Sequence, residues 1–287
     1  MQVARGLGAE ELRARLRAAR LYVVTDDSTA QDDLPALVEA AVAGGADLVQ
    51  LRRKGEPWTQ LVEVAGQLAG ICRRGGSLFL VNDHVDLALE VGSDGLHLGQ
   101  EDTPVPEARE RLGPRPLIGL STHTPEQARL AQRLPLDYIA AGPVRATPTK
   151  PDGQEVGFSQ VSAAAQVTRV PVVAIGGLDE GASAIEAGAD MVAVVRAVCS
   201  AGDPELAARR LRREAESAPA WRWITLNGEP RKSLPGETVL SLLGRLGAAA
   251  DGVAVELDGA ILPRERLGEV ELAAGAVVEI VHFVGGG

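Results

Sequence analysis

Short apolar runs rich in β-branched residues alternate with longer amphipathic segments along most of the chain. The apolar runs predict strands at Leu21–Thr25, Leu48–Arg52, Leu78–Val81, Gly95–Leu98, Leu117–Leu120, Tyr138–Ala141, Val172–Ile175 and Met191–Val195. Apolar residues spaced i, i+3 and i+4 predict helices at Leu34–Ala43, Thr59–Arg73, Val85–Val91, Pro104–Leu112, Pro125–Arg133, Ser159–Val167, Gly181–Ala187 and Pro204–Ala215. Such an alternation over about 200 residues is typical of a (β/α)₈ TIM barrel, an α/β fold.

An open, doubly wound parallel sheet is the main alternative for the same alternation. Such a sheet usually carries phosphate-binding glycines after its first strand, whereas Thr25-Asp26-Asp27 contains no glycine. The barrel is therefore the preferred interpretation. Ahead of the first strand, Glu10–Arg20 is rich in Arg and Glu and has leucines at helical spacing, which predicts a solvent-exposed helix.

The pattern changes at Ala218-Pro219-Ala220, a short stiff joint. Beyond it, two strands are expected to meet at Asn227-Gly228, a pair typical of a hairpin turn. A helix is expected from about Thr238 to Leu246, followed by strands at Val253–Leu257 and Val277–Val284. This order of elements is that of a small α+β β-grasp (ubiquitin-like) domain. We therefore expect a barrel at residues 1–217, a linker at 218–221 and the β-grasp domain at 222–287.

Composition narrows the class of protein. The 287 residues are 45% hydrophobic and 24% charged, ordinary values for a globular protein. A formal net charge of −10 argues against a general nucleic-acid binder. No apolar run approaches the roughly 18 residues of a membrane span, and the amino terminus lacks a signal-peptide pattern. Cys72 and Cys199 have neither metal-ligand nor disulfide-framework spacing, so we expect buried thiols in a cytoplasmic protein. The charge and the lack of a membrane span lead us to expect neither nucleic-acid nor membrane partners.

In a barrel, the groups that carry chemistry gather just after the strands, at the carboxyl face. This chain has polar residues or glycines after nearly every predicted strand. The candidates are Gln50, Arg52, Lys54, Asn82, Asp83, Asp102, Ser121, His123, Thr147, Thr149, Lys150, Gly176, Gly177, Val195 and Arg196. They predict two anion sites at one mouth, one metal-assisted near strands two to six and one built on backbone amides near strands seven and eight.

Lysine is scarce, since the chain contains only Lys54, Lys150 and Lys232. Lys150 follows Thr147 and Thr149 in a proline-containing loop, where a compact cation and two hydroxyls can bind phosphate oxygens. An ordinary proline-stiffened surface loop is the simpler interpretation of this segment alone.

Asp83 and Asp102 follow adjacent predicted strands. Two carboxylates beside anion-binding groups are a common way to hold Mg²⁺ together with a substrate phosphate. Each could instead cap the helix that follows it. His97 and His123 have no evident nucleophile partner, so a core or capping role is the simpler interpretation for both.

Six segments resemble thiamine phosphate synthase, in order and with barrel spacing over residues 20–216. They are Gln50-Leu51-Arg52-Arg53-Lys54, Asn82-Asp83-His84-Val85-Asp86-Leu87-Ala88-Leu89, Gly99-Gln100-Glu101-Asp102, Ser121-Thr122-His123-Thr124, Thr147-Pro148-Thr149-Lys150 and Ile175-Gly176-Gly177. The resemblance implies a transferase that joins 4-amino-2-methyl-5-pyrimidinylmethyl diphosphate to a thiazole phosphate, forming thiamine phosphate and releasing pyrophosphate.

Carried over onto this sequence, the resemblance implies a role for each candidate. The pyrimidine diphosphate would be bound by Gln50, Arg52, Lys54, Asn82, Ser121 and Lys150, of which Lys150, Arg52 and Ser121 would be catalytic. The thiazole phosphate would be bound by Thr147, Thr149, Gly177, Val195 and Arg196, and Gly176 is a further substrate-binding candidate. Mg²⁺, the expected cofactor, would be held by Asp83 and Asp102. The family commonly has Ser where this chain has Arg196, whose guanidinium could reach the phosphate or crowd it.

Residues 222–287 resemble the thiamine sulfur carrier protein, a β-grasp domain. The matching segments are Ile224–Glu229, Gly252–Leu257 and Val281–Gly287. The resemblance implies that the carboxylate of the Gly286-Gly287 end is adenylated and converted to a thiocarboxylate, with an adenylyltransferase and thiazole synthase as partners. Glycine suits this role because a tail without Cβ atoms can enter a narrow channel.

Two other functions stay open at this point. The barrel could be the related thiazole tautomerase, with His123 transferring the proton. Asp83, Asp102 and Lys150 weigh against it, because that reaction involves neither a diphosphate nor a metal. Alternatively, the barrel is a vestigial scaffold and the protein works only as a sulfur carrier.

Overall fold

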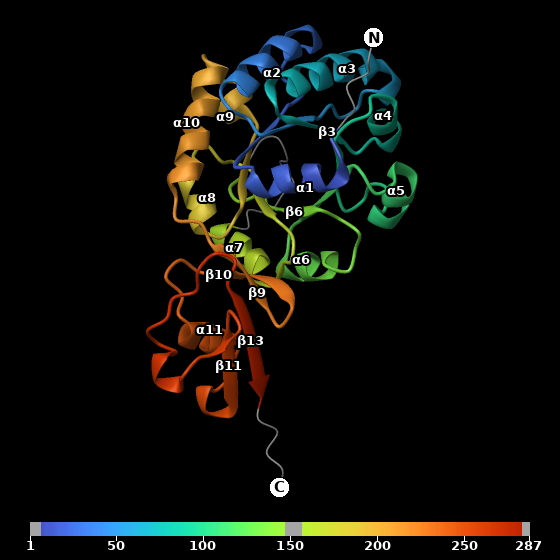
Figure 1. The fold of residues 1–287 in the computed structure, drawn as a ribbon. Helices are drawn as coiled ribbons and strands as arrows, with labels where there is room; N and C mark the ends of the chain where they lie inside the picture. Colours follow the sequence, from blue (N-terminus) through green and yellow to red (C-terminus); the bar gives the residue numbers. More distant parts are fainter. Residues whose placement is uncertain (1–6, 147–156, 283–287) are drawn as a thin grey trace.

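The computed structural model describes residues 7–146 and 157–282, which form a large domain and a smaller one beside it (Figure 1). The large domain is a closed barrel of parallel strands in sequence order, in which β1 also pairs with β8. Its strands are β1 (Leu21–Val24), β2 (Leu48–Leu51), β3 (Leu78–Asn82), β4 (Gly95–Leu98), β5 (Leu117–Thr122), β6 (Tyr138–Ala141), β7 (Val172–Ile175) and β8 (Met191–Val194). The predicted TIM barrel is confirmed, and the doubly wound open sheet is wrong.

Helices cover the outside of the barrel (Figure 1). They are α2 (Leu34–Ala43), α3 (Trp58–Gly75), α4 (Val85–Glu90), α5 (Val105–Leu112), α6 (Pro125–Ala131), α7 (Gly157–Val167), α8 (Ala182–Glu186), α9 (Arg196–Cys199) and α10 (Pro204–Ser217), with a 3₁₀ turn at Gln31–Asp33. Alternation along the strands sends Val23 and Val49 into the layer beneath these helices and Tyr22 and Leu48 into the barrel interior.

The first helix, α1 (Ala9–Ala18), has a different role from the one expected. It lies across one end of the barrel (Figure 1). Leu12 and Leu16 are buried in the cluster that fills the barrel interior, together with Leu48 and Leu117. The prediction of a merely solvent-exposed helix is wrong, because this apolar face closes the amino-terminal end of the barrel.

Gly119 on β5 leaves room for the ring of Tyr138. A Cβ atom at this position would lie 2.0 Å from Tyr138 Cζ. We expect Gly119→Ala to lower the free energy of unfolding by about 1–3 kcal/mol, the usual cost of overpacking a core. Urea denaturation measures the change.

Gly66→Ala in α3 is the matched control, because no atom beyond the helix's own backbone lies within 4 Å of the added Cβ. Alanine in a helix interior should raise the free energy of unfolding by roughly 0.5–1 kcal/mol. A similar response from both variants would contradict the packing explanation.

The smaller domain is a five-stranded mixed sheet packed on one helix. Its elements are β9 (Arg222–Leu226), β10 (Glu229–Ser233), α11 (Val239–Arg245), β11 (Val253–Leu257), β12 (Ala260–Ile261) and β13 (Val277–His282), with 3₁₀ turns at Ala250–Gly252 and Arg264–Arg266. The sheet order is β10-β9-β13-β11-β12, and β9 and β13 run parallel. The expected small α+β domain is therefore present.

The hairpin turn and the helix cap that the sequence predicts for this domain are both present in the structure. Asn227 and Gly228 have φ angles of 48° and 75°, the left-handed conformation that a type I′ turn requires. Thr238 caps α11, since its side chain accepts a hydrogen bond from the Ser241 amide while Ser241 Oγ accepts one from the Thr238 amide.

A buried ion pair joins the smaller domain to the barrel near the amino-terminal ends of β7 and β8. Lys232 on β10 is 1% exposed, and its Nζ donates to Asp190 Oδ2 at 2.5 Å and to the Gly188 carbonyl at 2.7 Å. Trp223 Nε1 donates to the other oxygen of Asp190 at 3.0 Å, and the Trp223 ring lies 5.0 Å from the ammonium. These contacts hold the two domains in one arrangement.

The two cysteines, Cys72 and Cys199, are both unpaired. Burial raises the pKa of each thiol to about 12, so both remain protonated and unreactive at neutral pH. Across residues 7–146 and 157–282, no helix combines the length and the apolar character needed to cross a membrane.

Candidate active site

A cavity of about 350 Å³ opens at the carboxyl ends of the barrel strands. It brings together every candidate of the barrel that lies in the described ranges: Gln50, Arg52, Lys54, Asn82, Asp83, Asp102, Ser121, His123, Gly176, Gly177, Val195 and Arg196. Five further residues of the sequence prediction lie outside the described residues, namely Thr147, Thr149, Lys150, Gly286 and Gly287.

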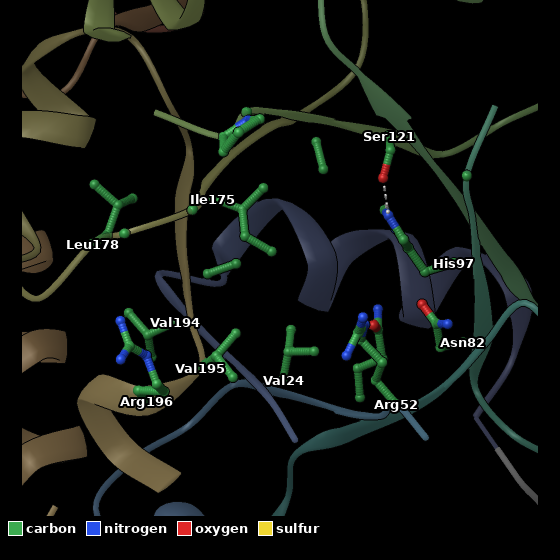
Figure 2. Close-up of a pocket in the computed structure, with 18 of the residues that line it drawn as sticks. Val24, Arg52, Asn82, His97, Ser121, Ile175, Leu178, Val194, Val195 and Arg196 are labelled. Atoms are coloured by element: carbon green, nitrogen blue, oxygen red, sulfur yellow. Dashed lines mark hydrogen bonds between the residues drawn. The ribbon is translucent and has the colours of Figure 1, made fainter. Parts of the chain in front are cut away.

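The cavity has two polar sides with apolar residues between them. Figure 2 shows Asn82, His97 and Ser121 on one side, while Arg196 lies on the other. Val24 lies between them. Ligand groups that need hydrogen-bond donors at both ends of the cavity would match this arrangement.

Arg52 is held in position at the cavity wall. Strand alternation places it on the same face as Gln50, and its backbone amide donates to Thr25 Oγ1 at 3.0 Å. Its guanidinium lies 3.5 Å from Asp27 Oδ2, and the side chain is only 10% exposed. A cation already ordered and largely shielded from water needs little reorganisation when an anion binds.

Asp83 and Asp102 form a carboxyl pair beside Lys54, whose Nζ lies 3.8 Å from Asp83 Oδ2. Burial and the contact with Asp102 raise the pKa of Asp83 to about 6. Burial also disfavours the charged form of Asp102, but hydrogen bonds from Asp83 and from the Gly99 amide, at 2.6 Å, hold the pKa of Asp102 below its ordinary value. Two carboxyl groups this close repel each other when both are charged, and a bound divalent cation would offset this repulsion.

Neither carboxylate caps a helix. α4 begins after His84 and α5 after Pro104, and neither start has a side-chain capping hydrogen bond. Asp83 instead has a φ angle of 60°, a left-handed conformation that few non-glycine residues adopt. The capping alternative is therefore wrong for both, and the sharp turn after β3 directs Asp83 toward Asp102.

Three residues at or behind the cavity wall were not assigned to ligand binding from the sequence, in which His97 was expected only in a core or capping role. Tyr22, Tyr138 and His97 form a row of hydrogen-bonded side chains that connects Gln50 with Ser121. Tyr22 and Tyr138 are the only tyrosines of the chain. Their rarity is the one feature of the sequence that could have drawn attention to them. Inward-pointing strand positions of a barrel are usually filled by aliphatic residues, so a tyrosine there is unusual.

Gly176 and Gly177 form the other polar side with Val195 and Arg196. Their φ angles are 100° and 67°, and added Cβ atoms would lie 2.5 Å from Pro143 Cβ and 2.7 Å from Arg145 Cβ. Only glycine fits such a backbone, which leaves peptide groups open to the cavity beside the Arg196 guanidinium.

Residues 21–198, more than half of the chain, match the family model described as thiamine monophosphate synthase. The chain belongs to the thiamine monophosphate synthase family. Residues 224–287 match a second model, that of the ThiS family. Both resemblances predicted from the sequence are thereby confirmed, and the smaller domain is a ThiS-family sulfur-carrier domain.

Relatives of the barrel are named thiamine-phosphate synthases. That of Mycobacterium sp. (strain JLS) is 44% identical over 215 residues, which cover 71% of this chain and 95% of the relative. That of Gloeobacter violaceus is 47% identical over 196 residues, covering 68% of this chain and 57% of the relative. The solved structure of thiamine phosphate pyrophosphorylase from Pyrococcus furiosus matches with a TM-score of 0.63 and 34% identity, over 71% of this chain and 98% of that one. The predicted enzyme class, thiamine-phosphate synthase in thiamine biosynthesis, is confirmed.

Proposed function

We propose that the barrel joins 4-amino-2-methyl-5-pyrimidinylmethyl diphosphate to a thiazole phosphate, giving thiamine phosphate and pyrophosphate. One observation carries this proposal: cations and carboxylates from the ends of β2, β3 and β4 share a single cavity with the glycine-lined site after β7 and β8. A reaction between two phosphorylated heterocycles needs two anion sites within one pocket.

The residue types suit the departure of a diphosphate. Loss of this group leaves a pyrimidine-stabilised cation and builds negative charge on the departing oxygens, so the protein must supply positive charge and positioning rather than a nucleophile. Arg52 and Lys54 supply the charge, and Asn82 supplies an uncharged donor. The catalytic role of Lys150 is carried over from the sequence alone.

Asp83 and Asp102 fit Mg²⁺, because they are neighbouring carboxyl groups that otherwise compete for a proton. Among the described residues, no three or more Asp, Glu, His or Cys side chains are placed so that they could hold a metal ion by themselves. Phosphate oxygens and water would therefore complete the coordination of this metal, as is usual for Mg²⁺. When bound, the ion would neutralise charge on the departing diphosphate.

We also infer that residues 222–287, connected through 218–221, serve separate proteins as a sulfur carrier. The expected partners are an adenylyltransferase and thiazole synthase, acting at Gly286 and Gly287. In support, the Lys232–Asp190 pair holds this domain at the amino-terminal side of the barrel, whereas the cavity opens at the carboxyl side. β13 also runs away from the barrel (Figure 1). The two unpaired thiols favour the cytoplasm as the place of both activities.

The barrel proposal is tested by incubating the full chain with both heterocycles and Mg²⁺ and measuring thiamine phosphate. We expect product in equal amount to pyrophosphate, and loss of synthesis when EDTA removes the metal. A tautomerase should ignore the chelator, and a vestigial barrel should bind no pyrimidine diphosphate analogue. Failure to form product at saturating substrates and Mg²⁺ would overturn the proposal.

Arg196→Ala tests the thiazole phosphate side. Charge-assisted hydrogen bonds contribute about 1.5–3 kcal/mol, so we expect KM for the thiazole phosphate to rise about 10-fold or more. KM for the pyrimidine diphosphate should stay unchanged in steady-state kinetics. A fall in KM for the thiazole phosphate would show instead that the guanidinium crowds the site.

Arg145→Ala is the control for this variant. Its guanidinium is paired with Asp179 and Glu180 and does not line the cavity. We expect neither KM to change. A rise equal to that in Arg196→Ala would mean that the effect comes from the general loss of positive charge near the site.

A further inference from the structure

We propose that Tyr22, Tyr138 and His97 are positioning residues that fix the hydrogen-bonding polarity of Gln50 and Ser121. The cavity then selects a pyrimidine that carries an amino group and an unprotonated ring nitrogen, and it rejects the corresponding oxo ring. This inference rests on the proposed function, because it names how the ring of the diphosphate substrate is recognised.

The three residues form an unbroken row through the barrel interior. Gln50 Nε2 donates to the Tyr22 hydroxyl at 2.5 Å, and the hydroxyls of Tyr22 and Tyr138 lie 3.1 Å apart. The Tyr138 hydroxyl lies 2.9 Å from His97 Nδ1, and His97 Nε2 lies 2.9 Å from Ser121 Oγ. Figure 2 shows the last of these contacts at the cavity wall. Gln50, His97 and Ser121 therefore line the cavity, while Tyr22 and Tyr138 lie behind it.

Proton counting gives the row a single direction. Gln50 donates to Tyr22, and the proton of the buried Tyr22 hydroxyl has an acceptor in the row only if it goes to the Tyr138 oxygen. The proton of Tyr138 then goes to His97 Nδ1, which must be the unprotonated ring nitrogen. His97 consequently carries its proton on Nε2 and donates to Ser121 Oγ. The opposite direction would require Gln50 to turn its carbonyl toward Tyr22.

Burial keeps this arrangement fixed. Both tyrosines are fully buried. Burial raises the pKa of both hydroxyls above the ordinary value, so neither loses its proton at neutral pH. The Tyr138 ring stacks on His97, with centroids 5.5 Å apart, and meets Tyr22 edge to face at 6.2 Å. A rotation of Tyr138 would break both ring contacts.

The two ends of the row consequently present different groups to a ligand. Gln50 directs one N–H of its amide to Tyr22, which leaves its carbonyl oxygen as an acceptor, while Ser121 accepts a hydrogen bond from His97 and offers its own hydroxyl as a donor. A 4-aminopyrimidine supplies an amino donor and a ring-nitrogen acceptor. A 4-oxopyrimidine supplies a carbonyl acceptor and a ring N–H donor, so it mismatches both groups.

The test measures the binding of two ligands by calorimetry with Mg²⁺ present, the 4-amino and the 4-oxo pyrimidinylmethyl diphosphates. A site built around hydrogen bonds discriminates strongly against a mismatched partner, so we expect the full-length protein to prefer the amino ligand by about 100-fold or more. Tyr138→Phe removes the hydroxyl in the middle of the row and should reduce this preference to below about 10-fold. Tyr22→Phe should do the same, and it keeps the test decisive if one variant fails to fold.

Thr122→Val is the matched control. It removes a buried hydroxyl on β5 next to Ser121, but that hydroxyl donates to the Ala140 carbonyl and lies outside the row. The preference for the amino ligand should remain at the level of the unchanged protein. If the tyrosine variants lost their ligand preference only because the barrel became less stable, Thr122→Val would lose it as well. Loss of the hydrogen-bonding polarity of the row should lower the preference only in the tyrosine variants.

Thiamine phosphate synthesis, assayed in parallel, separates the two hypotheses. Synthesis with an unchanged ligand preference in both tyrosine variants overturns the inference and leaves the proposed function standing. A preference for the oxo ligand in the unchanged protein also overturns the inference. Ligand discrimination that depends on the tyrosines, without synthesis, supports the inference and overturns the proposed function.

Discussion

Replacement of Asp83 by asparagine is expected to lower kcat/KM for thiamine phosphate synthesis by about 100-fold or more, a loss of about 2.7 kcal/mol of transition-state stabilisation. The substitution removes one of two carboxylates that we assign to Mg²⁺ while keeping the size of the side chain. It also keeps the backbone, since Asp83 has a φ angle of 60° and asparagine is among the residues that tolerate this conformation. Steady-state kinetics over a range of Mg²⁺ concentrations measures the loss.

The dependence on Mg²⁺ makes this prediction specific. A lost metal ligand raises the Mg²⁺ concentration needed for half-maximal activity, so excess Mg²⁺ should recover part of the rate. Asp86→Asn on α4 is the matched control, because Asp86 is exposed and pairs with Arg111 on the surface. It should leave the kinetics unchanged. Equal activity of Asp83→Asn and Asp86→Asn would remove Asp83 from the site.

Replacement of Lys232 by methionine is expected to lower the free energy of unfolding by about 3–5 kcal/mol. The variant leaves the Asp190 carboxylate buried without its cation, although Trp223 and the Val172 amide still donate to it. Breaking a buried pair from one side is costly because the remaining charge stays out of water. Urea denaturation followed by the fluorescence of Trp221 and Trp223, which lie at the joint, measures the change.

Arg231→Met is the control from the same strand. Arg231 pairs with Glu229 at 2.9 Å, but both side chains are solvent-accessible, so the loss should stay below about 1 kcal/mol. The Lys232→Met variant should also unfold its two domains in separate calorimetric transitions, since only the weaker contacts of Trp223 with Asp190 and of Arg169 with Glu229 still couple them. A single transition with unchanged stability would show that the ion pair does not hold the domains together.

Much of the fold follows from local sequence signals. Strand and helix ends of the barrel lie within two residues of the predictions, because apolar periodicity responds to burial on one face. The hairpin at Asn227-Gly228 and the capped start of α11 at Thr238 follow from residues that fix their own backbone. These signals act over a few residues, and a single sequence displays them fully.

The site was only partly visible in this way. Gln50 and Ser121 lie at the carboxyl ends of β2 and β5, and Arg52 directly follows β2. The barrel rule alone places these strand ends together. The rule does not say which of these groups touch. The contact of Asp83 with Asp102, and the row through Tyr22 and Tyr138, depend on distances between residues far apart in the sequence.

The amino-acid sequence by itself determined the barrel, the carrier domain and the set of polar residues at the strand ends, since each of these depends on periodicity, turn chemistry or the order of elements. Only the tertiary structure decided that Leu12 and Leu16 close the barrel, that Lys232 is buried against Asp190, and that Asp83 meets Asp102. The physical reason is that burial and electrostatic coupling arise between surfaces that meet only after folding. A charged or apolar side chain in a linear sequence carries no record of its eventual neighbour.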